Sequence, residues 1–374
     1  MTPTPILISA GEASGDMYAA RLAAALQQRA SVSLFGMGGP KMSAAGVHLV
    51  VNSSDVAVVG FTEILRHLPS LLRAMRRLVS EARRRRPPLA IFVDFPSFHL
   101  RLARKLRRVG VRNIYFVAPQ FWAWRPWRVR PMRRRFEQAL CIFPFEEEFF
   151  RQRAMPAKFV GHPLVGEVCA QTPRAEFFRA HGLDPARPLV ALLPGSRSSE
   201  LGHHLPVLLD ACRLLHKQRN AQFVLAAAPG LDGKSLRAAL PADLQVRVLH
   251  GETYDALAAA GVAVVSSGTA TIETALLDTP MVVVYRLSLL TALLAGPLVR
   301  TPFYSMVNLM AGRRIVPELV QHDFTAERVA AEVSRLLDSA AARDEMRHGF
   351  AEVREHLGPP GAVERAADLI AKMI

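Results

Sequence analysis

The sequence predicts an α/β protein with two Rossmann-like domains that face each other across a cleft, followed by a helical C-terminus. Its 374 residues exceed the length of a typical single domain. Short apolar runs alternate with amphipathic stretches, which is typical of βαβ units around a parallel sheet. This alternation occurs twice, separated by a polar, Pro-containing stretch. We therefore expect domains at 1–165 and 189–340, a connection at 166–188 and C-terminal helices at 341–374.

The first series of elements opens with a strand, a turn and a helix, in the order PILISA, GEASGD and MYAARLAAALQQR. A strand VSLFGMG follows, and then a helix from about residue 63 to 84. Spacings of three and four predict that one face of this helix is apolar and is formed by Leu65, Leu68, Leu72, Met75 and Val79. The stretches LAIFVDF, LRLARKLRRVG and RNIYFVAP then predict a strand, a helix and a strand.

The second series begins with the strand LVALLP and a helix from Ser199 to Arg219. Strands QFVLAAA, VRVLH and VAVVSS, the helix ATIETALLD and the strand MVVVYR follow, and helices are expected from Ala326 onward. Ligands of such sheets bind beyond the carboxyl ends of the strands, so the loops at those ends are the candidate sites.

The composition favours an ordered protein that binds anions. Half of the residues are apolar, and the net charge is +15, which attracts nucleic acid, acidic lipid or phosphorylated substrates. Cys141, Cys169 and Cys212 match no metal-ligand spacing and are expected to be reduced thiols. The chain opens without a secretory pattern, and its longest apolar run, 287–299, is too short to span a bilayer. Contact with a membrane surface remains compatible with these features.

Two turns of the second domain suit a diphosphate. In SSGTATIE (266–273) a strand delivers Ser267, Gly268 allows a close turn, and a helix begins near Thr269 with its amide groups pointing outward. Glu273 would reach the hydroxyls of a bound ribose. The alternative is an ordinary capped βα turn.

The second of these turns is LLPGSRSSE (192–200). It contains Gly195 and Ser196, places Arg197 at the turn, and offers Ser198 or Ser199 as the helix cap. A lone turn arginine is more often solvated. The pairing of two such turns favours a bound nucleoside diphosphate.

Two further Gly-rich stretches are not expected to bind nucleotides. GMGGPK (36–41) has Lys41 where the dinucleotide motif requires its third glycine. APGLDGKS (228–235) resembles a P-loop, but Pro241 leaves little room for the helix that should follow it.

In the first domain, GEASGD (11–16) follows the first strand. Glu12 and Asp16 would hydrogen-bond a sugar, while Ser14 and Gly15 permit close approach of a ligand. The alternative is a helix start that Ser14 or Asp16 caps.

A candidate general base, Asp94, ends the strand of FVDFPSFHLRLA (92–103). A carboxylate among Phe92, Phe95 and Phe98 should have a raised pKa and accept a proton near neutral pH. Asp94 would otherwise cap the following helix.

All three tryptophans of the chain, Trp122, Trp124 and Trp127, lie in PQFWAWRPWRVR (119–130), interleaved with arginines. Indole rings among arginines suit a lipid interface, where Trp124 and Arg125 would contact the substrate. Stacking on single-stranded nucleic acid and core packing of one or two of the rings are the alternatives.

Together these stretches resemble the lipid-A-disaccharide synthases, which are glycosyltransferases of the two-Rossmann-domain B-type fold. GEASGD, FVDFP, APQFWAWRPWRV, PFE (144–146), FVGHPL (159–164), LLPGSR, SSGTATIETALLDTPMVVVYR and NLMAGR (308–313) carry the resemblance in order along nearly the whole chain.

The resemblance implies an inverting transfer between UDP-2,3-diacylglucosamine and 2,3-diacylglucosamine 1-phosphate in lipid A (lipopolysaccharide) biosynthesis. The products are the β-1,6-linked disaccharide 1-phosphate and UDP. It implies no metal and no cofactor, and a peripheral location on the cytoplasmic face of the inner membrane, against an anionic lipid surface. Oligomeric state, a homodimer included, is not set by the sequence.

Carried over by position, the resemblance makes Asp94 the base, Arg197 the residue that holds the diphosphate, and Glu273 and Asn308 parts of the donor site. The family usually has Pro-Asp-Phe-Asn after the base, where this chain has Ser97 and His99 at the second and fourth positions. It also has Met306-Val307 before Asn308 in place of the usual Leu-Pro. The first departure puts acceptor contacts in doubt.

Two other functions stay open at this point. One is another enzyme of the same fold, such as a UDP-N-acetylglucosamine 2-epimerase or a transferase with a soluble acceptor. The other is a nucleic-acid-binding protein without catalysis, although the sequence contains no recognisable RNA- or DNA-binding module.

Overall fold

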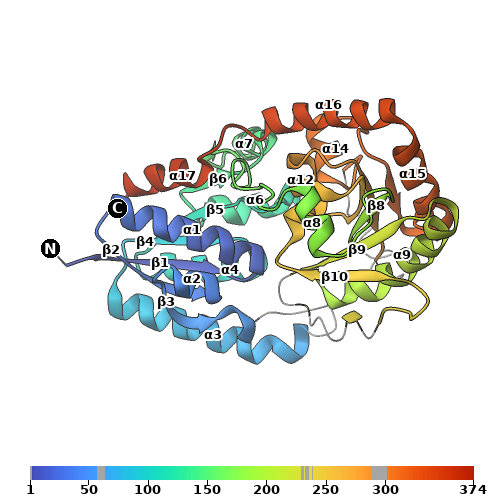
Figure 1. Cartoon of the computed structure of the whole chain (residues 1–374). Helices are drawn as coiled ribbons and strands as arrows, with labels where there is room; N and C mark the ends of the chain where they lie inside the picture. Colours follow the sequence, from blue (N-terminus) through green and yellow to red (C-terminus); the bar gives the residue numbers. More distant parts are fainter. Residues whose placement is uncertain (1, 57–63, 229–230, 232–235, 238, 288–300) are drawn as a thin grey trace. The chain divides into compact units, whose positions relative to one another are not determined.

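The computed structural model describes residues 2–56, 64–228, 231, 236–237, 239–287 and 301–374. The chain forms two compact units (Figure 1). The first contains Met1–Val165 and Leu357–Ile374, and the second contains Gly166–His356. The C-terminal helices are therefore divided between the units, since α16 (Ala340–His356) belongs to the second and α17 (Ala362–Ala371) to the first.

The first unit is built on a seven-stranded sheet in the order β3-β2-β1-β4-β5-β6-β7, and every neighbouring pair is parallel. Its strands are β1 (Thr4–Ala10), β2 (Val32–Gly38), β3 (His48–Asn52), β4 (Leu89–Val93), β5 (Arg112–Phe116), β6 (Gln138–Cys141) and β7 (Ala157–Phe159).

Helices cover both faces of this sheet. Its helical elements are α1 (Ala13–Arg29), α2 (Pro40–Ala44), η1 (Ser53–Asp55), α3 (Ile64–Arg85), α4 (Pro96–Arg107), α5 (Phe121–Trp124), η2 (Pro126–Arg128), α6 (Val129–Arg133) and α7 (Pro144–Arg151), with α17 packed against α1. Apart from the polar Ser9 on β1 and Asn113 on β5, the fully buried strand residues of this sheet are apolar on both faces, as expected for a covered parallel sheet. One of these faces packs against α3, α4 and α6.

The core-facing side of α3 differs in part from the one that the sequence predicts. Met75 is buried and Val79 packs against the core, but Leu72 is 43 % exposed. Ala74, Leu78 and Ala82 complete the buried stripe. The side chains of Leu65 and Leu68 lie outside the described residues. The buried stripe therefore coincides only in part with the predicted apolar face, and Leu72 of that face is exposed to solvent.

The second unit contains a parallel sheet in the order β10-β9-β8-β11-β12-β13. Its strands are β8 (Leu189–Leu193), β9 (Gln222–Ala227), β10 (Val246–His250), β11 (Val262–Ser266), β12 (Met281–Tyr285) and β13 (Glu318–Val320). The helical elements include α8 (Arg174–Ala180), α9 (Ser198–Arg219), α11 (Thr253–Ala259), α12 (Thr269–Leu276), α14 (Met306–Ala311), η4 (Gln321–Asp323) and α15 (Ala326–Asp338). Helices α9 and α15 pack together, and α12, α14 and α16 form another group.

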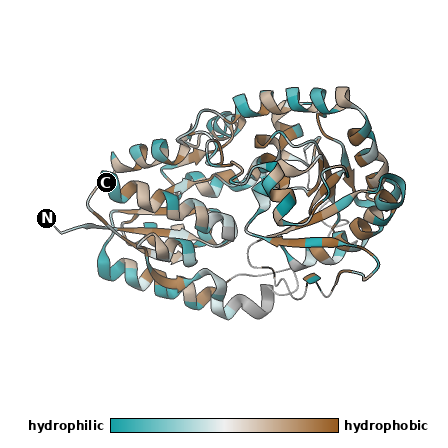
Figure 2. Cartoon of the chain, viewed as in Figure 1, coloured by the Kyte–Doolittle hydropathy of each residue, from teal (hydrophilic) through white to brown (hydrophobic). Residues whose placement is uncertain are grey.

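The hydropathy colours follow this layering, with apolar colour on the strands and both colours alternating along the helices (Figure 2). The predicted P-loop-like stretch and most of the 287–299 run lie outside the described residues.

Each sheet has a switch point, where successive strands leave the centre in opposite directions. In the first sheet it lies between β1 and β4, and in the second between β8 and β11. Ligands of open parallel sheets bind beyond the carboxyl ends of the strands at such points. The four turns that follow these strands begin at residues 11, 94, 194 and 267. All four are stretches that the sequence marks as candidate sites.

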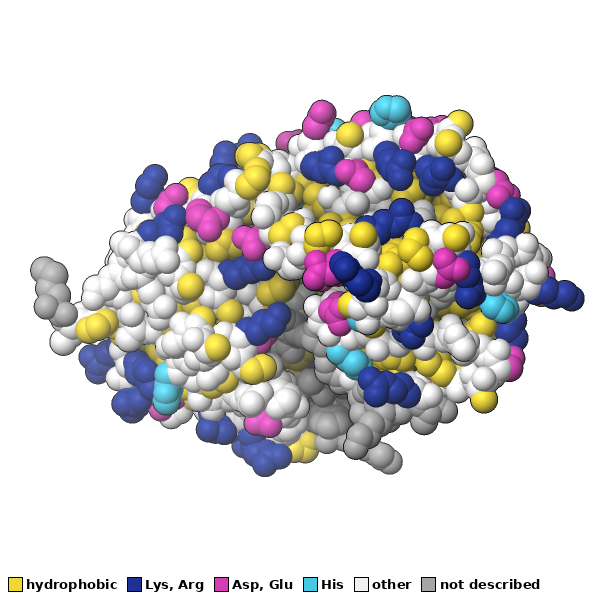
Figure 3. Space-filling view, in the orientation of Figure 1, with side chains coloured by type: hydrophobic (Ala, Val, Ile, Leu, Met, Phe, Trp, Pro, Cys, Tyr) yellow, Lys and Arg dark blue, Asp and Glu magenta, His cyan; other side chains and the backbone are white. Residues whose placement is uncertain are grey.

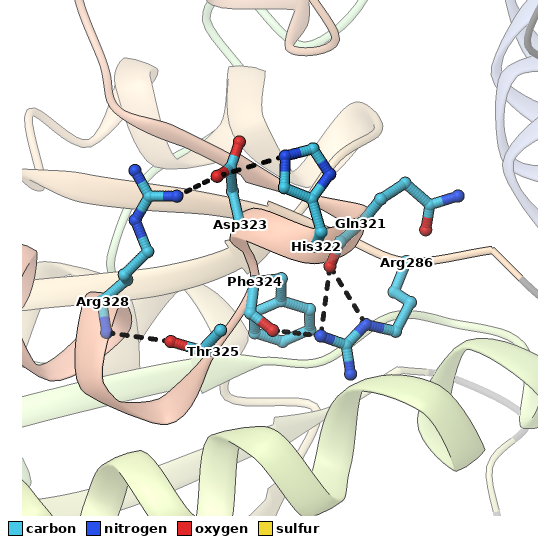
Figure 4. A network of polar contacts seen from close by, with 7 residues as sticks. All are labelled: Arg286, Gln321, His322, Asp323, Phe324, Thr325 and Arg328. Carbon is cyan, nitrogen blue, oxygen red and sulfur yellow. Dashed lines mark hydrogen bonds and ion pairs between the residues drawn. The ribbon is translucent and has the colours of Figure 1, made fainter.

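Beside the second switch point, a polar network holds the chain that follows β12 (Figure 4). The Arg286 guanidinium donates to the carbonyl oxygens of Gln321 and Phe324 and lies over the Phe324 ring. Thr325 caps α15 by accepting the Arg328 amide, and Arg328 also pairs with Asp323. The Arg286 side chain therefore holds the segment after β12 against residues 321–324.

Candidate functional site

The turn that carries Asp94 has an uncommon backbone. Asp94 and the next residue, Phe95, both adopt left-handed conformations, with φ of 56° and 52°. Such conformations are uncommon for residues other than glycine and tend to persist where surrounding contacts enforce them, often at functional sites. Oδ1 of Asp94 accepts the Phe95 amide at 2.7 Å, and the side chain is half-buried. The predicted base therefore stands at a tightly determined turn and not in a fully buried position.

The carbonyl oxygen of Asp94 is the point at which the turn is held. It accepts hydrogen bonds from His99 Nδ1 at 2.6 Å and from the Tyr115 hydroxyl at 2.5 Å. Because Nδ1 donates, Nε2 of His99 is the acceptor for the Ser9 hydroxyl, at 2.9 Å. Burial lowers the pKa of His99 to about 3, so the ring is neutral. His99 is therefore a buried support of the turn that carries Asp94.

The GEASGD turn packs directly on this support. A Cβ added at Gly15 would lie 3.2 Å from the Cβ of Asp94, so a larger residue there would press on the base. Ser14 is half-buried, and Glu12 is exposed at the start of α1. The glycine therefore allows the close approach of the β1 and β4 turns.

Asp16 has a different role from the predicted one. Its carboxylate accepts the amides of Gly39, Lys41 and Met42 at 2.7, 3.0 and 3.1 Å and so caps the start of α2. The expectation that Ser14 or Asp16 caps α1 is wrong, because the N-cap is Glu12 and no side chain caps that helix in the described structure. The GMGGPK turn directs its amides to Asp16.

The three tryptophans divide into one anchored ring and two exposed rings. Trp122 Nε1 donates to Glu146 Oε1 at 3.0 Å, and its ring packs edge-on against Phe145. Glu146 is fully buried, and burial raises its pKa to about 7. Trp124 and Trp127 are 36 % and 52 % exposed, and the Arg125 guanidinium lies 3.8 Å from the Trp124 ring centroid. Trp122 thus anchors a segment that presents Trp124, Arg125 and Trp127 to solvent.

In the second unit, the turn at 194–200 already contains a bound carboxylate. Glu200 Oε2 accepts the amides of Ser196 and Arg197 at 2.9 and 3.3 Å, and Oε1 accepts from the Arg197 guanidinium at 3.1 Å. Gly195 has φ of 126°, and a Cβ there would lie 2.5 Å from Glu200 Oε2. The amides that were predicted to face a phosphate are therefore occupied by an internal anion.

The predicted cap of this helix is also wrong. Arg197 is the N-cap of α9, not Ser198 or Ser199, and Glu200 forms a capping box with its backbone. The spacing of three residues between the N-cap and a glutamate is the sequence signal, but the motif usually begins with Ser or Thr.

A buried histidine links this turn to the end of β12. His204 Nδ1 donates to the Pro194 carbonyl at 2.7 Å, and its Nε2 accepts the Arg286 amide at 2.9 Å. Burial lowers the pKa of His204, so the neutral ring bridges the two segments. No sequence pattern indicated this role of His204.

The turn after β11 has the predicted open helix start. Gly268 is the N-cap of α12, and in the described structure no side chain caps the helix. Gly268 and Thr269 are exposed, and Ser267 donates its hydroxyl to the Tyr304 carbonyl at 2.7 Å. Glu273 is half-buried and accepts from the Tyr254 hydroxyl at 3.0 Å, while burial raises its pKa. This helix start suits an anionic group.

Asn308 is a support for a loop. It is fully buried; Oδ1 accepts the amides of Ile315 and Val316, and Nδ2 donates to the Val316 carbonyl and to Glu318. Glu318 also accepts the Ser305 amide and hydroxyl. Because these bonds use both acceptor and both donor positions of the amide, we interpret Asn308 as a residue that positions the 304–318 loop.

The candidate site residues form one group in each of the two units. In the first unit, Asp94 and Gly15 are in contact, with Glu12 and Ser14 on the same turn as Gly15. In the second unit, the switch point brings the turn with Gly195, Ser196 and Arg197 next to the one with Ser267, Gly268 and Thr269. The sequence did not indicate Ser9, Tyr115, Glu200 or His204. The capping-box spacing is a signal for Glu200, whereas the roles of the other three depend on contacts across the sheet or along a helix, for which the local pattern carries no signal.

Known proteins resemble this chain over its whole length. The family model described as lipid-A-disaccharide synthetase matches residues 6–372. A lipid-A-disaccharide synthase of Solibacter usitatus is 47 % identical over 371 residues, which is 99 % of this chain and 97 % of the relative. One from Myxococcus xanthus is 42 % identical, covering 100 % of this chain and 98 % of the relative.

Solved structures share the fold at low identity. The UDP-GlcNAc 2-epimerase from Neisseria meningitidis, bound to UDP-GlcNAc, has a TM-score of 0.70 and 10 % identity, covering 98 % of this chain and all of the other. A glycosyltransferase from Rickettsia africae has a TM-score of 0.58 and 9 % identity, covering 100 % and 98 %. These likenesses confirm the predicted pair of parallel-sheet domains typical of B-type glycosyltransferases. The family match and the full-length identities go further, and the chain belongs to the lipid-A-disaccharide synthase family.

Proposed function

We propose that this glycosyltransferase of lipid A synthesis condenses UDP-2,3-diacylglucosamine with 2,3-diacylglucosamine 1-phosphate. The products are the β-1,6-linked disaccharide 1-phosphate and UDP. Family membership supports the lipid A disaccharide role. The observation that carries the residue assignments is that Asp94 and Arg197 both stand on turns at sheet switch points, where ligands of this fold class bind.

Asp94 acts as the general base. It takes the proton from the 6-hydroxyl of the acceptor as that oxygen attacks C1 of the donor sugar. The bond between C1 and the diphosphate oxygen breaks on the opposite face, so the configuration at C1 inverts and UDP leaves with the electron pair. The contacts of the Asp94 carbonyl with His99 and Tyr115 hold the backbone of the turn, and the Phe95 amide donates to the carboxylate; in this proposal they orient the carboxylate for proton transfer at close range.

The turns of the second unit bind the donor. The open start of α12 and the Arg197 guanidinium stabilise the negative charge that grows on the diphosphate as the sugar leaves. Glu273 hydrogen-bonds the ribose in this proposal. The reaction requires the acceptor held by the first unit and the donor held by the second to meet.

The acyl chains of the proposed substrates and the positive charge of the chain support binding to an anionic lipid surface. Leu72, Trp124 and Trp127 are large apolar side chains exposed on the first unit. Lys and Arg side chains line the lower edge of that unit in Figure 3, over α3, which ends in three consecutive arginines at 83–85. No helix in the described part of the chain has the length and apolar character needed to cross a membrane. We propose peripheral binding to the cytoplasmic face of the inner membrane.

The competing enzyme is a UDP-sugar transferase or epimerase that uses a soluble substrate. Exposed Trp124 and Trp127 favour the lipid substrate. The test is to incubate the purified chain with both diacylated sugars and to identify the disaccharide by mass spectrometry, with deacylated glucosamine 1-phosphate as the matched acceptor. We expect disaccharide only with the diacylated acceptor. Equal turnover with the deacylated acceptor, or release of N-acetylmannosamine from UDP-N-acetylglucosamine, would contradict the proposal.

A further inference from the structure

Beside the predicted base, the first unit has a group of arginines. Arg128 Nη1 donates to the Ser97 hydroxyl at 3.0 Å, which joins the tryptophan segment to the first turn of α4. Burial lowers the pKa of Arg128, and the positive charges of Arg125 and Arg101 lower it further. The geometry agrees, because the Arg128 amide donates to the Arg125 carbonyl at 3.0 Å and Arg101 lies one helical turn after Ser97 on α4. We call Ser97, Arg101, Arg125 and Arg128 the arginine cluster.

The arginine cluster carries positive charge that no acidic side chain of the described residues neutralises. Throughout the described residues, no Asp or Glu forms an ion pair with Arg101, Arg125 or Arg128. Other arginines of the described residues do have acidic partners, as Arg197 has Glu200 and Arg219 has Asp338. Like charges held together without a counter-charge are unfavourable, unless an external anion completes the group.

The positions of the residues in the arginine cluster suit the binding of an anion. Ser97 lies in the first turn of α4, where the helix dipole is positive, and no side chain caps this helix start among the residues described. The Trp124 ring supports the face of the Arg125 guanidinium, which leaves the N–H groups at its edge free to donate. Arg125 and Arg128 are half-buried, whereas Ser97 and Arg101 are exposed, so a ligand can enter from solvent.

We propose that the arginine cluster binds a phosphomonoester, and that its ligand is the 1-phosphate of the acceptor sugar. The identity of the ligand rests on the proposed function. In that acceptor, the attacking 6-hydroxyl and the 1-phosphate lie on opposite sides of one sugar ring. Ser97 follows Asp94 by three residues on one turn, so the chain offers an anion site and a base at neighbouring positions. Holding the phosphate at the cluster presents the hydroxyl to Asp94.

The phosphate groups of a lipid surface could also bind to the arginine cluster. The experiment distinguishes these lipid phosphates from the 1-phosphate of the acceptor sugar. Binding of glucosamine 1-phosphate and of glucosamine to the full chain is measured by calorimetry, for the wild type and for Arg128→Gln, Arg101→Gln and Arg107→Gln. Arg107 is the matched control, because it is an exposed arginine of the same helix outside the cluster. Sedimentation with phosphatidylglycerol vesicles forms the second arm.

We expect the wild type to bind glucosamine 1-phosphate and not glucosamine. Loss of one charged hydrogen-bonding partner should raise Kd roughly 10- to 100-fold in Arg128→Gln, less in the exposed Arg101→Gln, and not in Arg107→Gln. The acceptor KM should rise in the same order with UDP affinity unchanged. Arg101→Gln keeps the test decisive if the half-buried Arg128 proves necessary for folding.

Equal weakening in Arg107→Gln would overturn the proposal, because it would indicate general attraction by the positive surface. Loss confined to vesicle binding would also overturn it and would assign the cluster to the membrane. If binding of glucosamine 1-phosphate depends on Arg128 but no disaccharide forms, the anion site stands and the proposed function fails.

Discussion

The two switch points of this molecule are built on different principles. Around Asp94 the supporting groups are neutral: a histidine whose burial lowers its pKa to about 3, a tyrosine and a serine, which hold the backbone through hydrogen bonds. Around Arg197 the supporting group is charged, because the Glu200 carboxylate occupies two backbone amides and pairs with the arginine. The first arrangement fixes an orientation, and the second balances charge.

The difference between neutral and charged supporting groups indicates which function each turn suits. A base must face its proton at one angle, and neutral supports hold that angle without changing the charge near the carboxylate. An anion site must accept a charged ligand and release it. An internal carboxylate keeps its amides satisfied in the absence of ligand, and a diphosphate can compete with it. The first turn should therefore be sensitive to geometry and the second to charge.

The largest expected effect is that of Asp94→Asn, which keeps the size of the side chain and removes its basicity. We expect kcat to fall by roughly 10²- to 10⁴-fold, the usual contribution of a general base. UDP affinity should be unchanged, because the proposed UDP site is on other turns. Disaccharide formation and calorimetry with UDP measure the two quantities. Turnover near the wild-type level would remove Asp94 from the role of base.

Arg197→Ala should act on binding. Removing the guanidinium should weaken UDP binding by about 1.5–3 kcal/mol, the usual contribution of hydrogen bonds to charged groups. Arg213→Ala is the matched control, since Arg213 lies on the same helix and pairs with Asp210 and Asp243. Calorimetry with UDP measures both variants. If both variants weaken UDP binding equally, net charge and not the position of Arg197 decides affinity.

The sequence predicted the sheets and the four switch-point turns, because these depend on local apolar runs and Gly-rich breaks. It misassigned groups whose partners are distant in the chain. The carboxylate of Asp16 is a group that could hydrogen-bond a sugar. In the structure its partners are instead the amides of Gly39, Lys41 and Met42, which are 23 or more residues away. No periodicity predicts such a contact.

The site departures from the family show the same limit. From the sequence, His99 was interpreted as the loss of a contact with the acceptor, because only its neighbours along the chain could be considered. In the structure its partners are Ser9, 90 residues away, and the backbone of the base itself. Asn308 similarly matched a donor-site residue, yet its amide is saturated by its own loop.

Two substitutions at His99 separate the bonds that it makes. The amide nitrogen of asparagine lies near the position of Nδ1, and that of glutamine near Nε2, so His99→Asn keeps a donor for the Asp94 carbonyl and His99→Gln loses it. We expect about tenfold lower kcat with unchanged KM in His99→Gln, and kcat close to the wild type in His99→Asn. Equal loss in both variants would indicate that ring packing, and not the carbonyl bond, supports the turn.

The same two variants also test how the free energy of unfolding depends on pH, and the direction of that dependence follows from the pKa of His99. The folded pKa of His99, about 3, is below its unfolded value of 6.5, so the unfolded chain binds more protons between these values. The stability contribution of the neutral ring is therefore complete above pH 6.5 and is lost as pH falls toward 3. Between pH 7 and pH 5 it should amount to roughly 1–2 kcal/mol. Both variants should lose that dependence in urea unfolding, whereas the exposed control His48→Asn should keep it.

The smallest expected effect tests the charged turn. Glu200→Gln keeps an oxygen that can accept the amides of Ser196 and Arg197, but it removes the negative charge that competes with a ligand. The pair with Arg197 is partly exposed and so contributes on the order of 0.2–1 kcal/mol. We therefore expect UDP to bind roughly two- to fivefold more tightly, with the gain decreasing as salt is added. Calorimetry at two salt concentrations measures it, with Glu252→Gln as a control in the same unit. Weaker UDP binding in Glu200→Gln would show that the carboxylate orients Arg197 for the ligand, and the second turn would then depend on geometry as the first one does.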